Sequence, residues 1–292
     1  MGYTEKKAEA WGESVKKGII AALLASFVLL LLASGCTTEE EIPAASEQEY
    51  LDYHSTMIPV EEKLERSPFL KNDFSVDGEG FVRYVGEDYQ ALKVIDVSAH
   101  QGNIEWSKVA ESGVEGVLIR AAYRGYGSVG NLKEDACFSQ NIKGALRAGL
   151  KVGAYVYSQA ITAEEAREEA QLVLSLTEGY TLELPIAFDW EHIDHTEART
   201  DNIGLGELTD IAKAFLEEIR LAGRTPMVYF NQEMAYLQYD LSELVGYEFW
   251  LAEYGAYPKF YYNVRAWQYA CILTMDGIKG AVDTNLYFTE NT

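Results

Sequence analysis

Cysteine and histidine are scarce in this chain. Its 292 residues include only 3 Cys and 4 His. His192 and His195 are three residues apart, but no second pair with metal-ligand spacing accompanies them. The sequence therefore predicts no metal site and no cofactor. Three cysteines are too few to define a disulfide framework, and we expect Cys137 and Cys271 to be buried thiols.

Positive charge is also in short supply. The chain has 24 Lys and Arg against 46 Asp and Glu, which gives a formal net charge of -22. Nucleic-acid binding depends on a basic surface, so the composition argues against a nucleic-acid partner. Hydrophobic residues make up 48% of the chain, which is typical of a globular body. We expect this body to be a monomer.

The N-terminal 36 residues have the composition of an export signal. Lys16 and Lys17 precede an uncharged stretch over 18–35, and small residues then lead to Cys36. The segment 32–36 resembles a bacterial lipobox, which predicts lipid attachment at Cys36. An uncleaved N-terminal anchor is the alternative. Both place the rest of the chain outside the cytoplasmic membrane and tether it there, because Lys and Arg are retained inside.

Residues 37–85 separate this segment from the main body. Glu, Ser, Thr and Ala dominate residues 37 to about 67, without strand periodicity, so we expect a tether with little fixed structure. The glycine-rich segment 78–86 is compatible with a small hairpin before the body or with an ordered linker. The predicted catalytic domain then extends over residues 86–292.

Short apolar runs alternate with longer amphipathic segments in this domain, as in parallel strands joined by helices. After residue 254 the helix-length connections disappear. The pattern predicts a TIM-like (β/α) barrel with its last helices reduced or missing, of the (β/α)5(β)3 type. The clearest helices are expected at 163–177 and 208–222, and the strands at 94–97, 116–121, 152–157, 186–190, 227–230, 249–252, 266–269 and 282–285.

The fourth strand ends in Asp189-Trp190-Glu191. Alternation along a strand places Asp189 and Glu191 on one face, roughly 7 Å apart at the usual strand rise. A carboxylate pair on a partly dehydrated surface raises one pKa, which suits a general acid beside an ionised partner. A solvated strand end with paired charges is the simpler alternative. The other strand ends favour catalysis, because their acidic and aromatic residues suit a sugar ligand.

These residues resemble glycoside hydrolase family 25, the Chalaropsis-type N-acetylmuramidases. The similar motifs are D-V-S-A-H-Q-G at 96–102, D-W-E at 189–191, W-L-A-E-Y at 250–254, W-Q-Y at 267–269 and V-D-T-N at 282–285. Two departures occur. Arg120 to Gly125 replaces the K-x-T-E-G of many members, and Tyr155-Val156-Tyr157 stands where many have Tyr-His-Phe.

The resemblance implies hydrolysis of the β-1,4 bond between N-acetylmuramic acid and N-acetylglucosamine in the peptidoglycan glycan strand. It implies that Glu191 is the general acid and base, and that Asp189 assists the 2-acetamido group of the substrate. Asp96 and Asp283 complete the implied catalytic set. The expected substrate-binding residues are Tyr155, Tyr157, Tyr229, Trp250, Tyr254, Gln268 and Asn285.

Two other functions remain open at this point. A family 18 chitinase-like barrel would need acidic residues where Leu184 and Ala187 stand. The other alternative is a membrane-tethered, non-catalytic barrel that binds the cell wall. The joint presence of Asp96, Asp189, Glu191 and Asp283 favours an enzyme over this alternative.

Overall fold

A computed structural model describes residues 48–193 and 197–291. From Gln48 onward the chain forms one compact unit. The predicted signal or anchor segment, the lipid site at Cys36 and the first part of the tether lie outside the described residues, as does His195. No helix within the described ranges is both long and apolar enough to cross a membrane.

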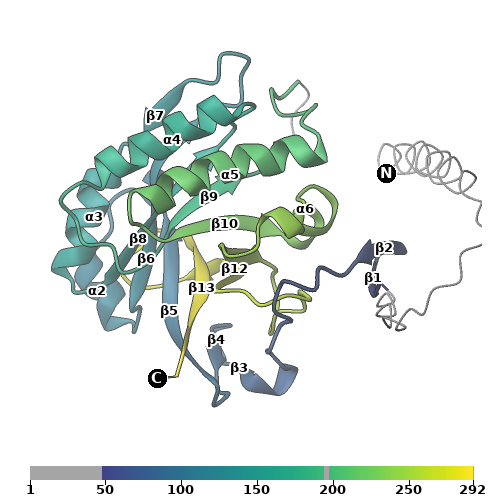
Figure 1. Ribbon diagram of the computed structural model, residues 1–292. Coiled ribbons are helices and arrows are strands. Elements are labelled where there is room, and N and C mark those ends of the chain that lie inside the picture. Colours follow the sequence, from purple (N-terminus) through teal and green to yellow (C-terminus); the bar gives the residue numbers. More distant parts are fainter. Residues whose placement is uncertain (1–47, 194–196, 292) are drawn as a thin grey trace, which may run out of the picture. The chain divides into compact units, whose positions relative to one another are not determined.

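A closed, mixed barrel forms the centre of this unit (Figure 1). Seven strands follow one another in parallel, and the last strand, β13, closes the barrel by pairing antiparallel with β12 on one side and β5 on the other. A short strand, β7 (Leu132–Glu134), extends the edge of β6. The barrel strands are β5 (Tyr89–Val97), β6 (Gly116–Arg124), β8 (Lys151–Ser158), β9 (Ile186–Trp190), β10 (Pro226–Asn231), β11 (Glu248–Ala252), β12 (Ala266–Thr274) and β13 (Ala281–Glu290).

Helices cover the outside of the first part of the barrel, and no described helix follows β11. The predicted barrel with missing last helices is therefore confirmed. Figure 1 shows α4 and α5 side by side over the neighbouring strands. The helices are α2 (Trp106–Glu111), α3 (Phe138–Arg147), α4 (Ala163–Leu176), α5 (Leu205–Leu221) and α6 (Gln232–Leu237), with 3-10 turns at η1 (Lys71–Asp73), η2 (Ala99–Gln101) and η3 (Leu241–Glu243).

Local sequence signals explain both helices that the sequence predicted clearly. The Thr162 hydroxyl accepts a hydrogen bond from the Glu165 backbone N–H (3.2 Å), which caps α4 at the expected residue. The helix α5 begins three residues earlier than expected, because the Glu207 carboxylate accepts from the Gly204 backbone N–H and completes the first turn. Gly223 follows α5 with a φ of 73°, a left-handed conformation that ends the helix.

The alternation of side chains divides the core into two parts. Outward-facing residues of the strands pack under the helices in one large cluster that includes Phe188, Phe215 and Phe230. A smaller cluster fills the barrel interior, where Leu118, Trp250 and their neighbours pack together. The lower interior is thus closed by apolar and aromatic side chains, and polar residues gather only above them.

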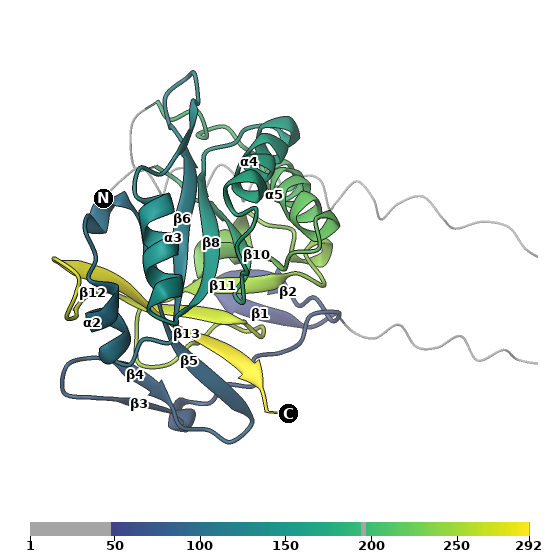
Figure 2. The same ribbon diagram turned by 90° about the vertical axis from the view of Figure 1, so that its left-hand side faces the viewer.

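The segment before the barrel covers strands that have no helix. Its strands β3 (Phe74–Val76) and β4 (Val82–Tyr84) form a hairpin that lies beside β5 and β13 in Figure 2. The ring centroid of Phe69 is 4.2 Å from that of Phe288 on β13, and the Phe74 ring is 5.3 Å from the Trp267 ring on β12. Aromatic packing from residues 69–84 therefore takes the place of the missing helices.

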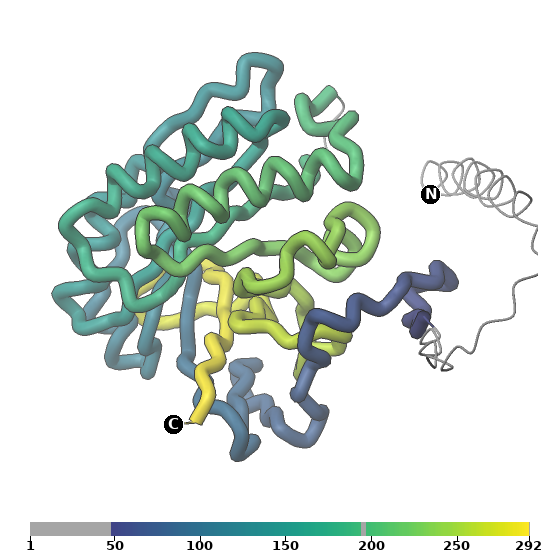
Figure 3. Tube along the Cα trace, viewed as in Figure 1, coloured from purple at the N-terminus to yellow at the C-terminus, as the bar shows by residue number. Residues whose placement is uncertain are grey.

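The expectation of little fixed structure up to about residue 67 is wrong for the part that the structure describes. The strands β1 (Tyr50–Tyr53) and β2 (Thr56–Pro59) form another hairpin. Figure 3 shows this N-terminal stretch running on beside the yellow-green loop before β12, where Ser67 N–H donates to the Tyr261 carbonyl (2.8 Å). The polar composition concealed these long-range bonds, which no local periodicity signals.

Cys137 and Cys271 are free thiols, as expected. Both are only partly buried, however, so the expectation that they are fully buried is wrong. Cys137 stands at the start of α3, and Cys271 lies in the part of β12 that extends beyond the barrel.

Removal of the Phe69 ring should destabilise the fold. Phe69 is 7% exposed and contacts the rings of Phe74, Tyr84, Tyr89 and Phe288. We expect Phe69→Ala to lower the free energy of unfolding by about 3–5 kcal/mol in urea titrations, because a large buried ring is lost. The neighbouring Leu70 is 68% exposed, so Leu70→Ala is the control and should change it by less than about 0.5 kcal/mol. A loss for Phe69→Ala as small as that for Leu70→Ala would show that this segment is not part of the core.

Candidate active site

The carboxyl pair Asp189 and Glu191 lies at the C-terminal end of β9. The apolar residues 186–188 are fully buried and lead into Asp189, which is 5% exposed, while Trp190 packs outward with no exposed surface. Glu191 is the first residue past the strand and is partly exposed. Both carboxyl groups therefore face the open end of the barrel, as the alternation along the strand predicted.

The two carboxyl groups interact through their charges. Glu191 lies just beyond Trp190, the last residue of β9 that pairs with β8, so both groups stand where the ladder ends. Each group therefore changes the proton affinity of the other.

Burial raises the pKa of Asp189 well above its ordinary value, and the charge of Glu191 raises it further. Burial also raises the pKa of Glu191, whereas its interaction with Asp189 lowers it. The pKa of Asp189 is therefore raised further than that of Glu191, and two carboxyl groups whose pKa values differ suit a general acid beside an ionised partner.

Asp96 on β5 is held in place by two amides from the nearby strands β12 and β13. Its Oδ2 accepts hydrogen bonds from Gln268 Nε2 (3.0 Å) and Asn285 Nδ2 (2.9 Å). Each amide oxygen in turn accepts from an aromatic side chain. Tyr229 OH donates to Gln268 Oε1 (3.1 Å), and Trp250 Nε1 donates to Asn285 Oδ1 (2.8 Å). These bonds fix both amides so that their N–H groups point at Asp96.

Asp283 lies directly opposite Asp96 in the ladder between β13 and β5. The expectation that the first and last strands bring these residues together is confirmed, but the position of Asp283 near the start of its strand was not foreseen. Because β13 runs antiparallel, its beginning rather than its end lies at the barrel mouth. Burial and the charge of Glu191 raise the pKa of Asp283 to about 6.

Stability should respond to the protonation of Asp96. Burial and the charge of Asp283 raise its pKa from 3.8 to about 7. A carboxyl group with a raised pKa contributes stability that is complete below about pH 4 and is lost as the pH rises through 7. Asp96→Asn removes this loss and keeps an oxygen for both amide donors. In urea titrations we compare the free energy of unfolding of Asp96→Asn with that of the wild type. The difference in favour of the variant should be about 1–3 kcal/mol larger at pH 7 than at pH 5. Parallel pH profiles of the two proteins would contradict this assignment.

The structure separates the predicted sugar-binding residues into two groups. Tyr157 is partly exposed at the end of β8, and Tyr254 is 59% exposed beside the mouth. Tyr155 and Tyr229 are buried, and both rings pack edge-on against Trp250. Gln268 is buried beneath Tyr254, whose OH lies 3.4 Å from Gln268 Oε1.

Trp250 and Asn285 do not reach the surface of the mouth. They are 1% and 0% exposed, so the prediction that they contact sugar is wrong for this structure. Their side chains instead support Asp96 from below. The strand-end pattern identified them because alternation gives the face of the barrel on which a side chain lies, but not its depth.

Arg120 and Asp135 form an ion pair at the mouth that sequence reasoning did not assign. Arg120 Nε lies 2.8 Å from Asp135 Oδ2, and the same oxygen accepts from the Ala99 backbone N–H (3.0 Å). Asp135 Oδ1 accepts from the Cys137 N–H (2.9 Å). Burial and the neighbouring carboxyl groups raise the pKa of Asp189, whereas the positive charge of Arg120 lowers it. An Asp just before a helix is a recognisable capping signal, but it does not reveal the partner on β6.

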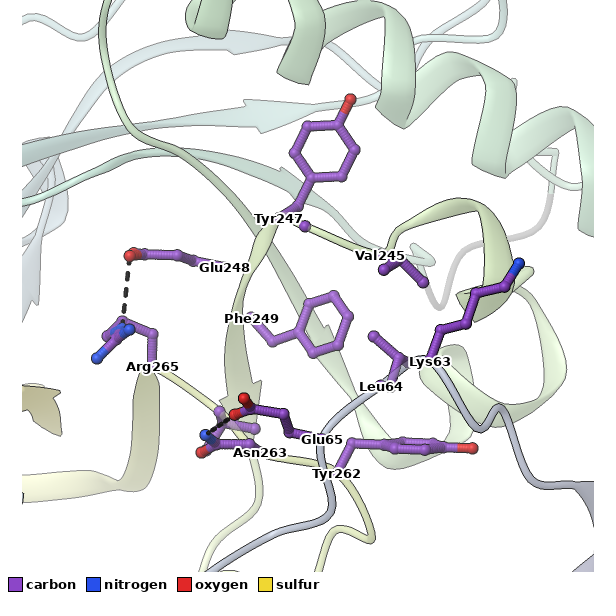
Figure 4. A pocket seen from close by; sticks show the side chains of 12 residues that line it. Lys63, Leu64, Glu65, Val245, Tyr247, Glu248, Phe249, Tyr262, Asn263 and Arg265 are labelled. Carbon is purple, nitrogen blue, oxygen red and sulfur yellow. Dashed lines mark hydrogen bonds and ion pairs between the residues drawn. The ribbon is translucent and has the colours of Figure 1, made fainter. Parts of the chain in front are cut away.

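A hollow of about 290 Å³ lies at the other end of the barrel strands (Figure 4). Phe249 and Leu64 line it. Three of its charged groups already have partners, since Arg265 lies 3.4 Å from Glu248 and Asn263 Nδ2 donates to Glu65 (3.1 Å). This hollow has no carboxyl pair comparable to that of the mouth. Within the described ranges, no three His, Cys, Asp or Glu side chains cluster as a metal site would require.

A (β/α) barrel with a pair of carboxyl groups at a strand end is the arrangement expected of a glycoside hydrolase. The family model for glycosyl hydrolases family 25 matches residues 95–278, and the chain belongs to this family. The match begins in β5 and ends before β13, so Asp96 and the carboxyl pair lie within it.

Two similar proteins illustrate the range of the family. An autolytic lysozyme from Clostridium acetobutylicum is 27% identical over 193 residues, which cover 66% of this chain and 54% of that protein. The chain thus spans about half the length of this relative. The uncharacterized protein YegX from Escherichia coli O157:H7 is 27% identical over 203 residues, 66% of this chain and 68% of YegX.

Solved structures share the fold. The modular autolysin LytC from Streptococcus pneumoniae, solved in complex with a synthetic peptidoglycan ligand, has a TM-score of 0.59 at 20% identity, over 83% of this chain and 67% of LytC. A bacterial lysozyme from Streptomyces coelicolor has a TM-score of 0.55 at 22% identity, over 70% of this chain and 93% of that chain.

Proposed function

We propose that this protein is a peptidoglycan hydrolase that cleaves the β-1,4 bond between N-acetylmuramic acid and N-acetylglucosamine. The observation that carries the proposal is the pair of carboxyl groups, Asp189 and Glu191, at the C-terminal end of β9, where burial raises the pKa of both. Membership of family 25 and the similarity to an autolytic lysozyme support the choice of substrate.

In this proposal Glu191 protonates the leaving glycosidic oxygen and then activates water. It is more exposed than Asp189 and is therefore the group that reaches the bond. Its proton comes from Asp189, whose pKa is raised the further of the two by burial. No protein N–H or O–H in the described part of the chain donates to the buried Asp189 Oδ1. An acetamide N–H of the substrate supplies the missing donor, stabilises ionised Asp189 and so shifts the proton to Glu191.

The same geometry favours the substrate's own amide as nucleophile. Two carboxyl groups that are two residues apart at the end of one strand do not naturally lie on opposite sides of a sugar ring, as a retaining or inverting carboxylate pair must. With Asp189 orienting the 2-acetamido group, its oxygen attacks the anomeric carbon and the leaving oxygen takes the proton of Glu191. Water then opens the cyclic intermediate and returns a proton to Glu191. The mechanism requires net retention of configuration and an N-acetyl group.

The surrounding charges assist the positive transition state. Asp96 and Asp283 place negative charge near the developing oxocarbenium ion, and Arg120 limits the total negative charge of the mouth. Tyr157 and Tyr254 offer exposed aromatic surface on which sugar rings can pack.

The direct test is digestion of purified peptidoglycan with the chain from Gln48 onward, which forms one compact unit. The products are reduced with borohydride, and their new ends are identified by mass spectrometry. Muramitol ends are expected. Glucosaminitol ends would assign the other bond, and the absence of new ends would indicate the non-catalytic wall-binding alternative.

We also propose an extracytoplasmic, membrane-anchored location, which rests on the residues 1–36 and their likeness to a lipoprotein signal. Fractionation of cells that produce the full chain should place it with the membranes. Recovery of the full chain from the cytosol would exclude this location.

A further inference from the structure

We propose that Gln159 is a positioning residue that sets the place of Glu191 in the active site. This inference rests on the proposed function, because it concerns the group that moves the proton. Gln159 directly follows β8 and has no exposed surface. It belongs to none of the strand-end motifs by which the sequence indicated an active site.

The Gln159 side chain extends the sheet by one residue. The last residues paired between β8 and β9 are Ser158 and Trp190, so Glu191 lies just beyond the ladder. There, Gln159 Nε2 donates to the backbone carbonyl of Glu191 at 2.7 Å. It also donates to the backbone carbonyl of the preceding residue, Ser158, at 3.0 Å. A side-chain amide thus replaces the backbone bond that the end of the strand leaves out.

Two further contacts restrain this region. The Gln159 Oε1 lies 3.4 Å from the hydroxyl of Thr200, which is also fully buried. On the outer face, Trp190 Nε1 donates to the Ala160 carbonyl at 3.0 Å. Hydrogen bonds therefore join the segment after β8 to the end of β9 at two points, from Gln159 to Glu191 and from Trp190 to Ala160.

The segment that carries Gln159 is itself anchored. The Ser158 hydroxyl accepts from the Ala160 N–H (3.1 Å) and lies close enough to Glu169 of α4 to influence the pKa of its carboxyl group. Glu169 is fully buried and accepts from Arg124 Nε at 2.6 Å. Gln159 is thus fixed relative to α4 and β6, and it transmits this fixed position to Glu191.

A firm position matters because Glu191 must both take a proton from Asp189 and reach the glycosidic oxygen. The bond to its carbonyl restrains the Glu191 backbone just beyond the last paired residues of β8 and β9. Displacements of about 1 Å at a reacting group are sufficient to lower rates on the order of 100-fold. Loss of Gln159 should therefore reduce turnover more than substrate binding.

The test compares Gln159→Met, which keeps the length of the side chain and removes its amide, with Gln171→Met at an exposed position on α4. We expect Gln159→Met to lower kcat on peptidoglycan at least tenfold, with KM within twofold, and to displace the pH–rate profile because the carboxyl pair is disturbed. Gln171→Met should match the wild type. Phe69→Ala serves as a second control that lowers stability far from the mouth without moving the pH profile.

The inference is overturned if Gln159→Met folds and retains the kcat and pH profile of the wild type. If this variant does not fold, Gln159→Asn takes its place, since it keeps a buried amide that is too short to reach the Glu191 carbonyl. Infrared titration of the carboxyl bands in each variant gives a measurement independent of activity. An inactive wild type would reject the proposed function, whereas unchanged titration of the Asp189 and Glu191 pair in the variant would reject the role of Gln159.

Discussion

Glu191→Gln is expected to lower kcat on peptidoglycan by about 10³-fold or more. General acid and base catalysis contributes typically 10²–10⁴-fold, and this residue serves both steps of the proposed reaction. The amide keeps the size of the side chain but cannot donate a carboxyl proton to the leaving oxygen. Initial rates of reducing-end release at several substrate concentrations would measure the effect.

The fold should survive this substitution. Burial raises the pKa of Glu191, so replacing it with a neutral amide removes an unfavourable charge and should leave the unfolding temperature equal or higher. Glu164→Gln, on the exposed surface of α4, is the matched control and should keep full activity. Activity of Glu191→Gln within tenfold of the wild type would exclude Glu191 as the general acid.

Asp189→Asn is expected to lower kcat by about 10²–10³-fold, the range found when one stabilising group of a transition state is removed. Asn retains an oxygen that can accept the acetamide N–H, but it lacks the negative charge that stabilises the amide as it attacks. It also cannot return a proton to Glu191. The loss should therefore appear in kcat, measured on the same peptidoglycan.

De-N-acetylated glycan separates this role from a structural one. If Asp189 acts through the acetamide, the wild type should cleave this substrate poorly, and Asp189→Asn should lose little more. Equal loss on both substrates would show that Asp189 acts on Glu191 alone. Near-full activity of Asp189→Asn on acetylated peptidoglycan would exclude the acetamide mechanism.

Much of the fold follows from local patterns. Each predicted barrel strand is present, because a buried strand in a (β/α) barrel must be an apolar run between turn signals. The motif residues Asp96, Asp189, Glu191 and Asp283 lie together at one end of the barrel, since strand ends converge there. The prediction for Asp283 reached the right place although it assumed the wrong strand direction.

Other features could not be predicted from local patterns. The polar residues 48–67 contain two strands that pair with each other, and backbone bonds to the distant loop near Tyr261 hold the end of this segment. Trp250 and Asn285 share a face with the acidic residues of the mouth but are more deeply buried. The partners of Arg120 and Gln159 come from other elements, so neither residue stands out in the sequence.

The amino-acid sequence by itself determined the eight strands and the acidic residues at their ends, because both follow from local patterns of apolar and polar residues. Only the tertiary structure decided how these residues are placed. Closure by the antiparallel β13 brings Asp283 opposite Asp96, and burial raises the pKa of Asp189 and of Glu191. Both effects depend on distances between strands and on exclusion of water, which exist only after the chain has folded.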